Sequence, residues 1–222
     1  MAGVEILLKG IVKRRGRFTL RVDALQVRER LVLVAGPNGS GKSTLLSIMA
    51  GVLRPNRGRV EYRTDEGVLS VEEAWSRLRL SFLLDAVEPP DATVEELIDL
   101  SCLDSCDDVV EGLGLRRVLR EKYLALSAGY RRRVKLALVY ARRPRVALLD
   151  EPFNDIDYES IWAIREFVAR QADEKGIVTI VSSHIDPGLD FQRVLILEDG
   201  RIVYDGGPEE SPLPRMCLPR KR

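Results

Sequence analysis

The residues that could do chemistry begin with a glycine-rich loop, GPNGSGKST, at positions 36–44. The loop matches the pattern G-x-x-x-x-G-K-[S/T], follows a short apolar run and precedes a helix-like segment. Glycines let the backbone curl closely enough for its N–H groups to point at phosphate oxygens, and the start of the helix adds its positive end. The loop therefore predicts a site for nucleotide phosphates.

Each member of this loop has an expected role. Lys42 reaches the β- and γ-phosphates, the Ser43 hydroxyl ligates Mg²⁺, and Thr44 adds a further phosphate contact. The other members are expected to wrap the phosphates; they are Gly36, Pro37, Asn38, Gly39, Ser40 and Gly41. A chance glycine-rich turn is the alternative, and it would arise in roughly one chain in a hundred of this length. The strand-loop-helix context makes a chance match rarer still.

A pair of carboxylates closes the next informative run, VALLDEP, at positions 146–152. Ligands of an open α/β sheet gather at the carboxyl ends of its strands, which is where Asp150 and Glu151 fall. Asp150 is expected to hold Mg²⁺ through water, and Glu151 to polarise the attacking water as general base. Alone, the pair could equally be a solvated turn, but the phosphate loop favours the catalytic interpretation.

The only histidine of the chain, His184, follows the apolar run IVTIVSS. A lone histidine in a loop is usually a surface residue. Here it comes directly after a buried-strand pattern, on the edge of the sheet that carries the phosphate loop. We therefore expect His184 to donate to a γ-phosphate or to orient water.

The stretch LSAGY, at positions 126–130, precedes a segment with apolar residues at helical spacing. That spacing predicts a helix that begins near Ala128, with Ser127 as its N-cap. A helix N-terminus with a serine hydroxyl and a glycine backbone, here Ser127 and Gly129, can bind an anion. An ordinary capped helix is the alternative.

The composition is that of a folded domain with balanced charge. The 222 residues are 45% hydrophobic, which is enough for one domain, or for a core with a small inserted subdomain. Lys and Arg number 35 against 34 Asp and Glu, whereas a nucleic-acid binder usually has a larger basic excess. No signal-like segment and no apolar run of about 18 residues occurs. We expect a cytosolic chain that meets a membrane only through a partner.

The three cysteines, Cys102, Cys106 and Cys217, are odd in number and scattered. Such a set argues against a disulfide framework. Cys102 and Cys106 could share a helix face, but no further Cys or His lies near enough to complete a metal site. We expect small thiols, buried or partly buried.

Strand and helix patterns alternate along the chain. Apolar runs that predict strands lie at 31–36, 59–62, 145–150 and 176–183, and a hairpin that turns at Asp199-Gly200 closes the chain. Helices are expected after the phosphate loop and from a capping box formed by Thr93 and Glu96. This order predicts an α/β fold, with a mainly parallel sheet core and antiparallel strands at the N-terminus. Residues 86–140, mostly helical, would be a subdomain inserted into a core of residues 1–85 and 141–222.

The set of motifs resembles the ATP-binding subunit of ABC transporters, a P-loop NTPase fold. In the family's order, GPNGSGKST is similar to Walker A, LSAGY to the signature, VALLDE to Walker B, NDID (154–157) to the D-loop, and His184 to the switch histidine. The resemblance covers essentially the whole chain. It implies Mg²⁺-dependent ATP hydrolysis that drives transport, and a single ABC domain over residues 1–222.

The resemblance also implies partners. Two such subunits, either a homodimer or two different paired ATPase subunits, would face each other, with each ATP held between the Walker A of one and the signature of the other. Transmembrane subunits would place a short coupling helix in the groove between core and helical subdomain. The chain would then lie on the inner face of the cell membrane.

Some positions depart from the family's pattern. The usual signature is LSGGQ, and Ala128 and Tyr130 stand where it has glycine and glutamine. Asp85 occupies the place of the Q-loop glutamine and could contact Mg²⁺-bound water. The aromatic residue that stacks on adenine is expected to be Phe18, with Arg15 as the alternative through a cation–π contact.

The alternative function is that of a soluble ABC-type ATPase acting on DNA or ribosomes. Relatives in DNA repair carry a long coiled-coil insertion, and those on ribosomes carry two ATPase cassettes, whereas this chain has neither. The basic ending PRKR is too short to favour nucleic acid, so no nucleic-acid partner is expected. A GTPase is disfavoured because no N-K-x-D motif occurs.

Overall fold

The structure is a computed structural model, and it describes residues 3–214. Cys217 and the ending PRKR lie outside the described residues. The strands are β1 (Glu5–Arg15), β2 (Phe18–Val27), β3 (Leu31–Ala35), β4 (Arg57–Thr64), β5 (Gly67–Leu69), β6 (Ser81–Leu83), β7 (Val146–Leu149), β8 (Val178–Ser183), β9 (Arg193–Glu198) and β10 (Arg201–Gly206). The α-helices are α1 (Lys42–Met49), α2 (Val71–Arg77), α3 (Val94–Ser101), α4 (Asp107–Gly112), α5 (Ala128–Ala141) and α6 (Tyr158–Asp173).

The strands form two sheets. The larger sheet has the order β10-β9-β3-β8-β7-β6, in which β9, β3, β8, β7 and β6 are parallel and β10 pairs antiparallel with β9. The smaller sheet is antiparallel, with the order β2-β1-β4-β5. The predicted fold, a mainly parallel core with antiparallel N-terminal strands and a final hairpin, is confirmed.

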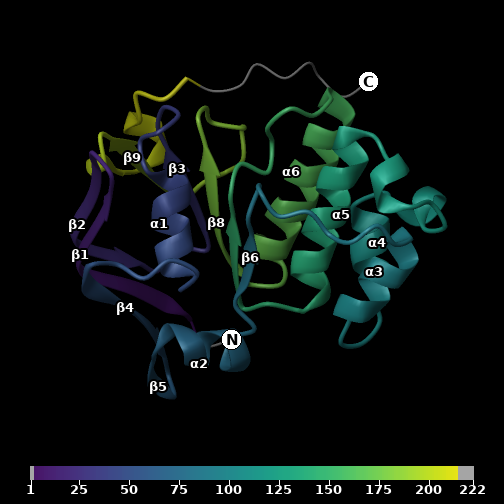
Figure 1. Ribbon diagram of the computed structural model, residues 1–222, viewed down its shortest axis with the longest axis horizontal. Helices are drawn as coiled ribbons and strands as arrows, with labels where there is room; N and C mark the ends of the chain where they lie inside the picture. The colour runs from purple at the N-terminus through teal and green to yellow at the C-terminus, as the bar shows by residue number, and fades with distance from the viewer. Residues whose placement is uncertain (1–2, 215–222) are drawn as a thin grey trace.

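Strand β3 shows why the larger sheet is buried on both faces. Successive side chains of a strand point to opposite faces, and every residue of β3 is buried. Leu31, Leu33 and Ala35 pack with α5 and α6. Val32 and Val34 pack with α1 and the smaller sheet. Figure 1 shows the same layers, with the smaller sheet and α1 on one side of the parallel strands and α5 and α6 on the other.

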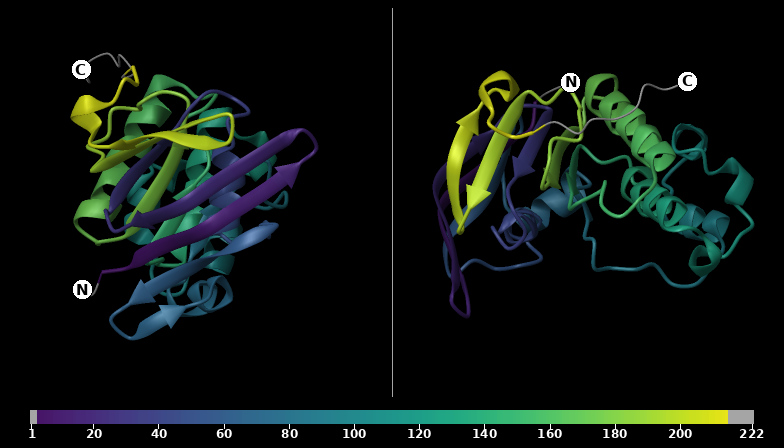
Figure 2. Two further views of the ribbon diagram at one scale, coloured as in Figure 1. Left: turned by 90° about the vertical axis from the view of Figure 1, so that its left-hand side faces the viewer. Right: turned by 90° about the horizontal axis from the view of Figure 1, so that it is seen from above.

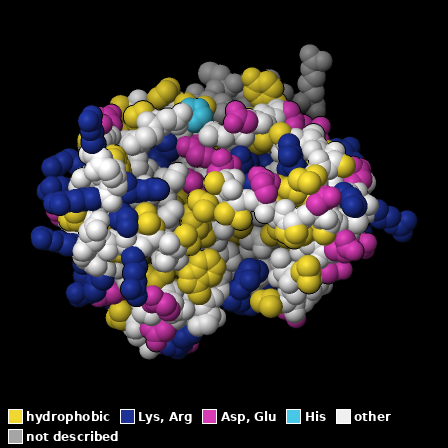
Figure 3. Space-filling view, viewed as in Figure 1, with side chains coloured by type: hydrophobic (Ala, Val, Ile, Leu, Met, Phe, Trp, Pro, Cys, Tyr) yellow, Lys and Arg dark blue, Asp and Glu magenta, His cyan; other side chains and the backbone are white. Residues whose placement is uncertain are grey.

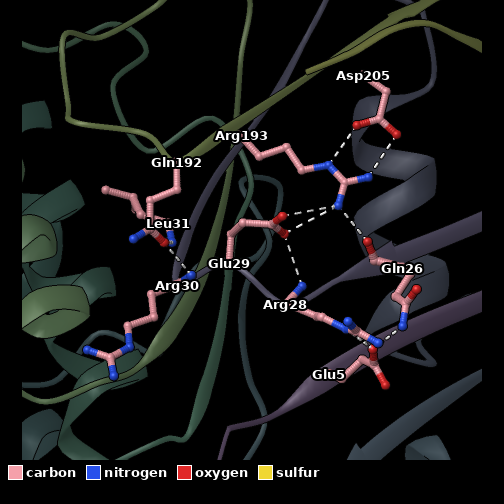
Figure 4. Close-up of polar contacts among 9 residues, drawn as sticks. All are labelled: Glu5, Gln26, Arg28, Glu29, Arg30, Leu31, Gln192, Arg193 and Asp205. Carbon is pink, nitrogen blue, oxygen red and sulfur yellow. Dashed lines mark hydrogen bonds and ion pairs between the residues drawn. The ribbon is translucent and has the colours of Figure 1, made fainter. Parts of the chain in front are cut away.

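Arg193 at the start of β9 joins the two sheets. Its guanidinium donates to both carboxylate oxygens of Asp205, at 2.6 and 2.8 Å, and to the backbone oxygen of Gln26 at 2.6 Å (Figure 4). The same group is 3.3 Å from Glu29. The hydrogen bond to Asp205 is the main cause that raises the pKa of Arg193. Because β2, β9 and β10 meet at this one side chain, the smaller sheet is held in a fixed position against the larger one.

The helices α3 and α4 and most of α5 fall within residues 86–140, between β6 and β7 in the chain. They pack beside α6, away from the smaller sheet (Figure 1). The expected capping box is present, because the Thr93 hydroxyl accepts from the backbone N–H of Glu96, and the Glu96 carboxylate accepts from that of Thr93. The division of the chain at residues 86 and 140 stays a prediction.

The expectation of free thiols at Cys102 and Cys106 is wrong, because the structure joins them in a disulfide. They do not share a helix face. Cys102 follows the last residue of α3 and Cys106 precedes the first residue of α4, so the turn between the helices brings the two sulfurs together. Arg143 binds this turn through the backbone oxygen of Ser105 and a bidentate pair with Asp108.

Loss of the disulfide should lower stability. A Cys102→Ser variant should have a free energy of unfolding about 2 kcal/mol lower than the wild type, because the unfolded chain regains the entropy that closing this short loop removes. This loss corresponds to a Tm roughly 4–8 °C lower. Thermal unfolding with and without a reductant measures it. Reductant should lower the Tm of the wild type to that of the variant and leave the variant unchanged. A wild type insensitive to reductant would contradict the cross-link.

Candidate functional site

The phosphate loop curls between β3 and α1 in a conformation that requires glycine. Gly36 has φ 141°, and a Cβ there would lie 2.1 Å from the backbone oxygen of Leu197. Gly41 has φ 109°, and a Cβ there would lie 2.8 Å from the ring of Phe18. The contact at Gly36 is with backbone and leaves no room for a side chain, and at Gly41 the ring of Phe18 would have to move. The glycines predicted to shape this loop therefore also let two neighbouring strands approach it.

Lys42 lies in the mouth of the loop, 5% exposed. Its ammonium donates to the backbone oxygens of Gly36 at 2.9 Å and Pro37 at 3.3 Å, and it lies 3.0 Å from a carboxylate oxygen of Glu151. The sequence predicted a lysine directed at phosphates but gave no sign of this ion pair. A buried positive charge is therefore held within a ring of loop backbone.

Asp150 is the point where three elements meet. Its Oδ1 accepts from the hydroxyl of Ser43, at the start of α1, at 2.9 Å and from that of Ser182, in β8, at 2.7 Å. The same Ser182 hydroxyl accepts from the backbone N–H of Glu151 at 2.9 Å. The structure thus brings two of the three residues predicted at the magnesium site, Ser43 and Asp150, into contact. Ser182 was missed, although two serines ending an apolar strand were a signal for it.

The electrostatics of Asp150 suit a cation. Burial is the main cause that raises its pKa, and the charges of Glu151 and Asp85 raise it further. The hydrogen bonds from Ser182 and Ser43 lower it. Burial and the neighbouring negative charges thus destabilise the charged form of the carboxylate, and a divalent cation beside it would stabilise that form.

Glu151 and His184 lie side by side at the carboxyl edge of the larger sheet. Glu151 has φ 47°, a conformation that a non-glycine residue adopts rarely and that clusters at functional sites. Its Oε2 is buried without a hydrogen-bond partner among the described residues, and Nδ1 of the half-exposed His184 is 3.7 Å away. The Ser40 hydroxyl is likewise buried without a partner among residues 3–214. The phosphate loop and the neighbouring edge of the sheet therefore each contain a buried polar atom that could hydrogen-bond to a ligand.

A cavity of about 370 Å³ opens over the phosphate loop. Its lining residues are Arg15, Phe18, Asn38, Gly39, Gly41, Lys42, Ser43, Thr44, Glu151 and Asn154. Phe18 and Arg15 both reach it, because they are a directly opposed pair at the end of the β1–β2 hairpin. Their place at its rim agrees with either one stacking on a base. Asn154 had no predicted role of its own beyond membership of the D-loop.

Asp85 does not line this cavity. It lies two residues beyond the end of β6, and its carboxylate pairs with Arg132 of α5 at 2.5 Å. Its backbone oxygen accepts from Lys135 at 2.8 Å. The predicted contact of Asp85 with the metal stays a prediction, and the observed partner is the helix that begins at the signature.

The signature residues lie away from the phosphate loop of their own chain. Ser127 is the N-cap of α5, as predicted, and its hydroxyl accepts from the backbone N–H of Tyr130 at 3.4 Å. Gly129 is buried against the start of α6, where a Cβ would lie 2.1 Å from Ser160 Oγ and 2.4 Å from Asp157 Oδ2. Close packing is thus a second reason for glycine at this position.

The family can be assigned on a direct match. The family model for ABC transporters matches residues 23–154, more than half of the chain. The chain belongs to the ABC transporter family. The matched segment contains the phosphate loop, the signature and the Asp150-Glu151 pair, and the resemblance inferred from the sequence is confirmed.

Curated relatives support the assignment. The chain is 33% identical to the thiamine import ATP-binding protein ThiQ of Jannaschia sp., across 92% of this chain and 93% of that protein. It is 32% identical to the lipopolysaccharide export system ATP-binding protein LptB of Acidithiobacillus ferridurans, across 88% and 87%. A zinc import ATP-binding protein, ZnuC of Acinetobacter baylyi, is 28% identical across 73% of this chain, and the match spans only 60% of that relative's length.

Solved structures show the same fold. The ATP-binding cassette MJ1267 of an ABC transporter superposes with a TM-score of 0.77 at 23% identity, across 95% of this chain and 93% of that one. The dimeric bacterial cassette MJ0796 gives a TM-score of 0.74 at 23% identity, across 91% and 98%. None of the helices in the described part of this chain has the length and apolar character of a membrane span.

The packing of Gly129 can be tested by one methyl group. Gly129→Ala should lose about 1–3 kcal/mol of unfolding free energy, because the methyl collides with Asp157 and Ser160. Without that collision, alanine in a helix would be more stable than glycine by about 1 kcal/mol. Urea unfolding measures the difference. The matched control is Ala128→Gly, at the exposed neighbouring position, which should lose at most about 1 kcal/mol. A Gly129→Ala protein as stable as the wild type would refute the close contact.

Proposed function

We propose that this chain binds and hydrolyses ATP with Mg²⁺ as the energy-coupling subunit of an ABC transporter. The observation that carries the proposal is one cluster at the carboxyl edge of the larger sheet. There Lys42 and Ser43 from the start of α1 meet Asp150 and Glu151 from the end of β7 and His184 from the end of β8. A lysine, a hydroxyl beside a carboxylate, and a second carboxylate beside a histidine are the groups that phosphoryl transfer to water requires.

Nucleotide binding rests on the loop. Its backbone and the ammonium of Lys42 would hold the phosphates, and Phe18 or Arg15 would cover the base at the rim of the cavity. Ser43 and Asp150 would hold Mg²⁺, which usually binds one or two protein groups together with substrate phosphates. The ion would supply positive charge against the charge that develops on the phosphate oxygens.

Hydrolysis rests on Glu151. Its carboxylate is buried and has one oxygen free of hydrogen bonds among the described residues, so it can accept a proton from water. His184 is near enough to orient that water or to donate to a phosphate oxygen. The ion pair with Lys42 occupies one carboxylate oxygen of Glu151. Phosphates bound in the loop would compete for the lysine and release that oxygen.

A second subunit would complete the site. Ser127 is exposed at the start of α5, outside the cavity of its own chain. A helix start that presents a hydroxyl can bind phosphate, so we infer that it faces the ATP of an opposing subunit. That subunit would be a second copy of this chain or a paired ATPase subunit.

An apolar groove would receive a membrane partner. A cavity of about 620 Å³ lies between the larger sheet and the helices α3 and α5, and Figure 3 shows yellow apolar side chains gathered in this hollow. Leu100 is 83% exposed there, and Val52 and Val87 are each 58% exposed. Exposed apolar side chains in one concave patch mark a contact with another protein. We assign this groove to a short helix of a transmembrane subunit, which would hold the chain peripherally at the inner face of the cell membrane.

Removing the base should separate binding from hydrolysis. Glu151→Gln should lower the ATPase rate about 100- to 10,000-fold and leave ATP binding intact. It should form a dimer with ATP and Mg²⁺ but not without them, measured by light scattering. Adding Ser127→Arg should abolish that dimer, whereas Ser76→Arg, at an exposed serine of α2, should not. Failure to bind ATP would refute the function, and binding without a dimer would refute a homodimer.

A charge in the groove should weaken membrane association. In the native host, Leu100→Glu should reduce the fraction of the chain that sediments with membranes, because a carboxylate would be buried against an apolar partner helix. The control is Leu103→Glu, three residues away and 57% exposed but outside the groove. The ATP-dependent dimer of the purified Leu100→Glu protein should be unchanged. Equal membrane fractions for both variants would rule out the groove as the docking site.

A further inference from the structure

The strand register of the smaller sheet places three arginines on one face. Val12 of β1 is directly opposite Arg21 of β2 on one side and Arg57 of β4 on the other. Directly opposed residues point to the same face, and Arg14, two residues from Val12, points the same way. Arg15 pairs with Phe18, and both line the nucleotide cavity on the opposite face. The pleat thus separates the nucleotide side of this sheet from an arginine side.

The arginine side is open to solvent. When the molecule is turned so that the smaller sheet faces the viewer, no helix covers that face of β1, β2 and β4 (Figure 2). Lys and Arg side chains gather at the corresponding edge in the space-filling view (Figure 3). The segment 6–22 contains six Lys or Arg residues and no Asp or Glu.

A hollow of about 190 Å³ lies among these arginines, which is room for roughly six water molecules at about 30 Å³ each. It is lined by Val12, Arg14, Arg21, Asn56 and Arg57. The carboxamide oxygen of Asn56 accepts from the backbone N–H of Arg14 at 2.8 Å, which leaves the NH₂ group of Asn56 to donate elsewhere. The backbone N–H of Asn56 donates to Val12 at 2.7 Å and fixes its position. The side chains around the hollow therefore offer hydrogen-bond donors and one apolar contact.

The positive charges of this hollow are not neutralised within the described chain. Arg14, Arg21 and Arg57 are exposed and form no ion pair with any of residues 3–214. Other arginines of the same sheet do form them, as Arg59 does with Glu61 and Arg63 with Glu5. Three guanidinium groups kept close together repel one another. An anion between them would remove that repulsion.

We propose that this hollow is a second anion site, which binds clustered phosphate groups. Guanidinium groups present paired N–H donors that match phosphate oxygens, and they retain their charge at any physiological pH. The ligand is either the headgroup of an anionic phospholipid or a soluble polyphosphate. Because the hollow and the nucleotide cavity lie on opposite faces of the sheet, both ligands can be held at once.

The test compares two triple variants with equal charge. Arg14→Gln/Arg21→Gln/Arg57→Gln removes the site. The control, Arg30→Gln/Arg120→Gln/Arg170→Gln, removes three exposed arginines that lie elsewhere. The first probe is tripolyphosphate, and its binding is followed through the NMR signals of the arginine Nε–Hε groups. Single-arginine variants assign these signals. The signals of Arg14, Arg21 and Arg57 report on this hollow even if tripolyphosphate also binds the phosphate loop. The second probe is sedimentation with vesicles of phosphatidylcholine, with and without phosphatidylglycerol. ATP binding serves as the check on folding.

We expect the wild type and the control to bind one of the two probes, and the site variant to bind it at least about tenfold more weakly. Shifted signals of Arg14, Arg21 and Arg57 with tripolyphosphate alone would identify a soluble ligand. Sedimentation only with phosphatidylglycerol would identify a lipid headgroup. The proposal is overturned if the wild type binds neither probe, or if the control loses as much binding as the site variant. Either result would leave the nucleotide site untouched, so it would not bear on the proposed ATPase.

Discussion

The nucleotide edge of this protein depends on one buried carboxylate. Asp150 is 3% exposed, and a charged group so deep in a protein is costly unless it is hydrogen-bonded. Its bonds come from the first turn of α1 and from β8, so satisfying the charge also sets the position of the phosphate loop against the sheet. Ser182 also fixes the position of Glu151, because its hydroxyl oxygen accepts a hydrogen bond from the backbone N–H of Glu151. The residues proposed as metal ligands and the residue proposed as general base are therefore positioned by the same contact.

A comparable link joins the signature to the D-loop. Gly129 packs directly on Asp157 and Ser160, and Asp157 caps α6 through the backbone N–H of Ser160 at 2.8 Å. Arg133, one turn along α5, donates to the Ser160 hydroxyl at 2.9 Å. The start of α5 and the start of α6 are thus packed and hydrogen-bonded to each other. If the opposing subunit proposed above displaced the signature, it would also move the D-loop, which follows Glu151 in the chain.

The sequence predicts best what is local. The phosphate loop, the strand ends and the N-caps at Thr93 and Ser127 each depend on a few adjacent residues, and all are found where expected. Contacts between segments that are distant in the sequence could not be predicted, because no short stretch of residues indicates them. The pair of Asp85 with Arg132 and that of Lys42 with Glu151 join residues far apart in sequence, so only the folded chain shows them. The prediction of free thiols failed for another reason. The spacing of Cys102 and Cys106 also fits one face of a helix, but α3 ends at Ser101, before Cys102.

The two faces of the smaller sheet depend on an irregularity near Gly10. The β1 residues that belong to the hydrophobic core under this sheet are Ile6 and Leu8 before it and Ile11 after it, so the alternation shifts by one residue. The register of β1 with β4 shifts at the same place, and Gly58 of β4 approaches so closely that a Cβ would lie 2.4 Å from Gly10. A one-residue shift exchanges the faces of a strand. Without this bulge, Arg14 would point towards the phosphate loop and Arg15 away from it. The glycines that permit the bulge therefore determine which basic side chain lines the cavity over the phosphate loop.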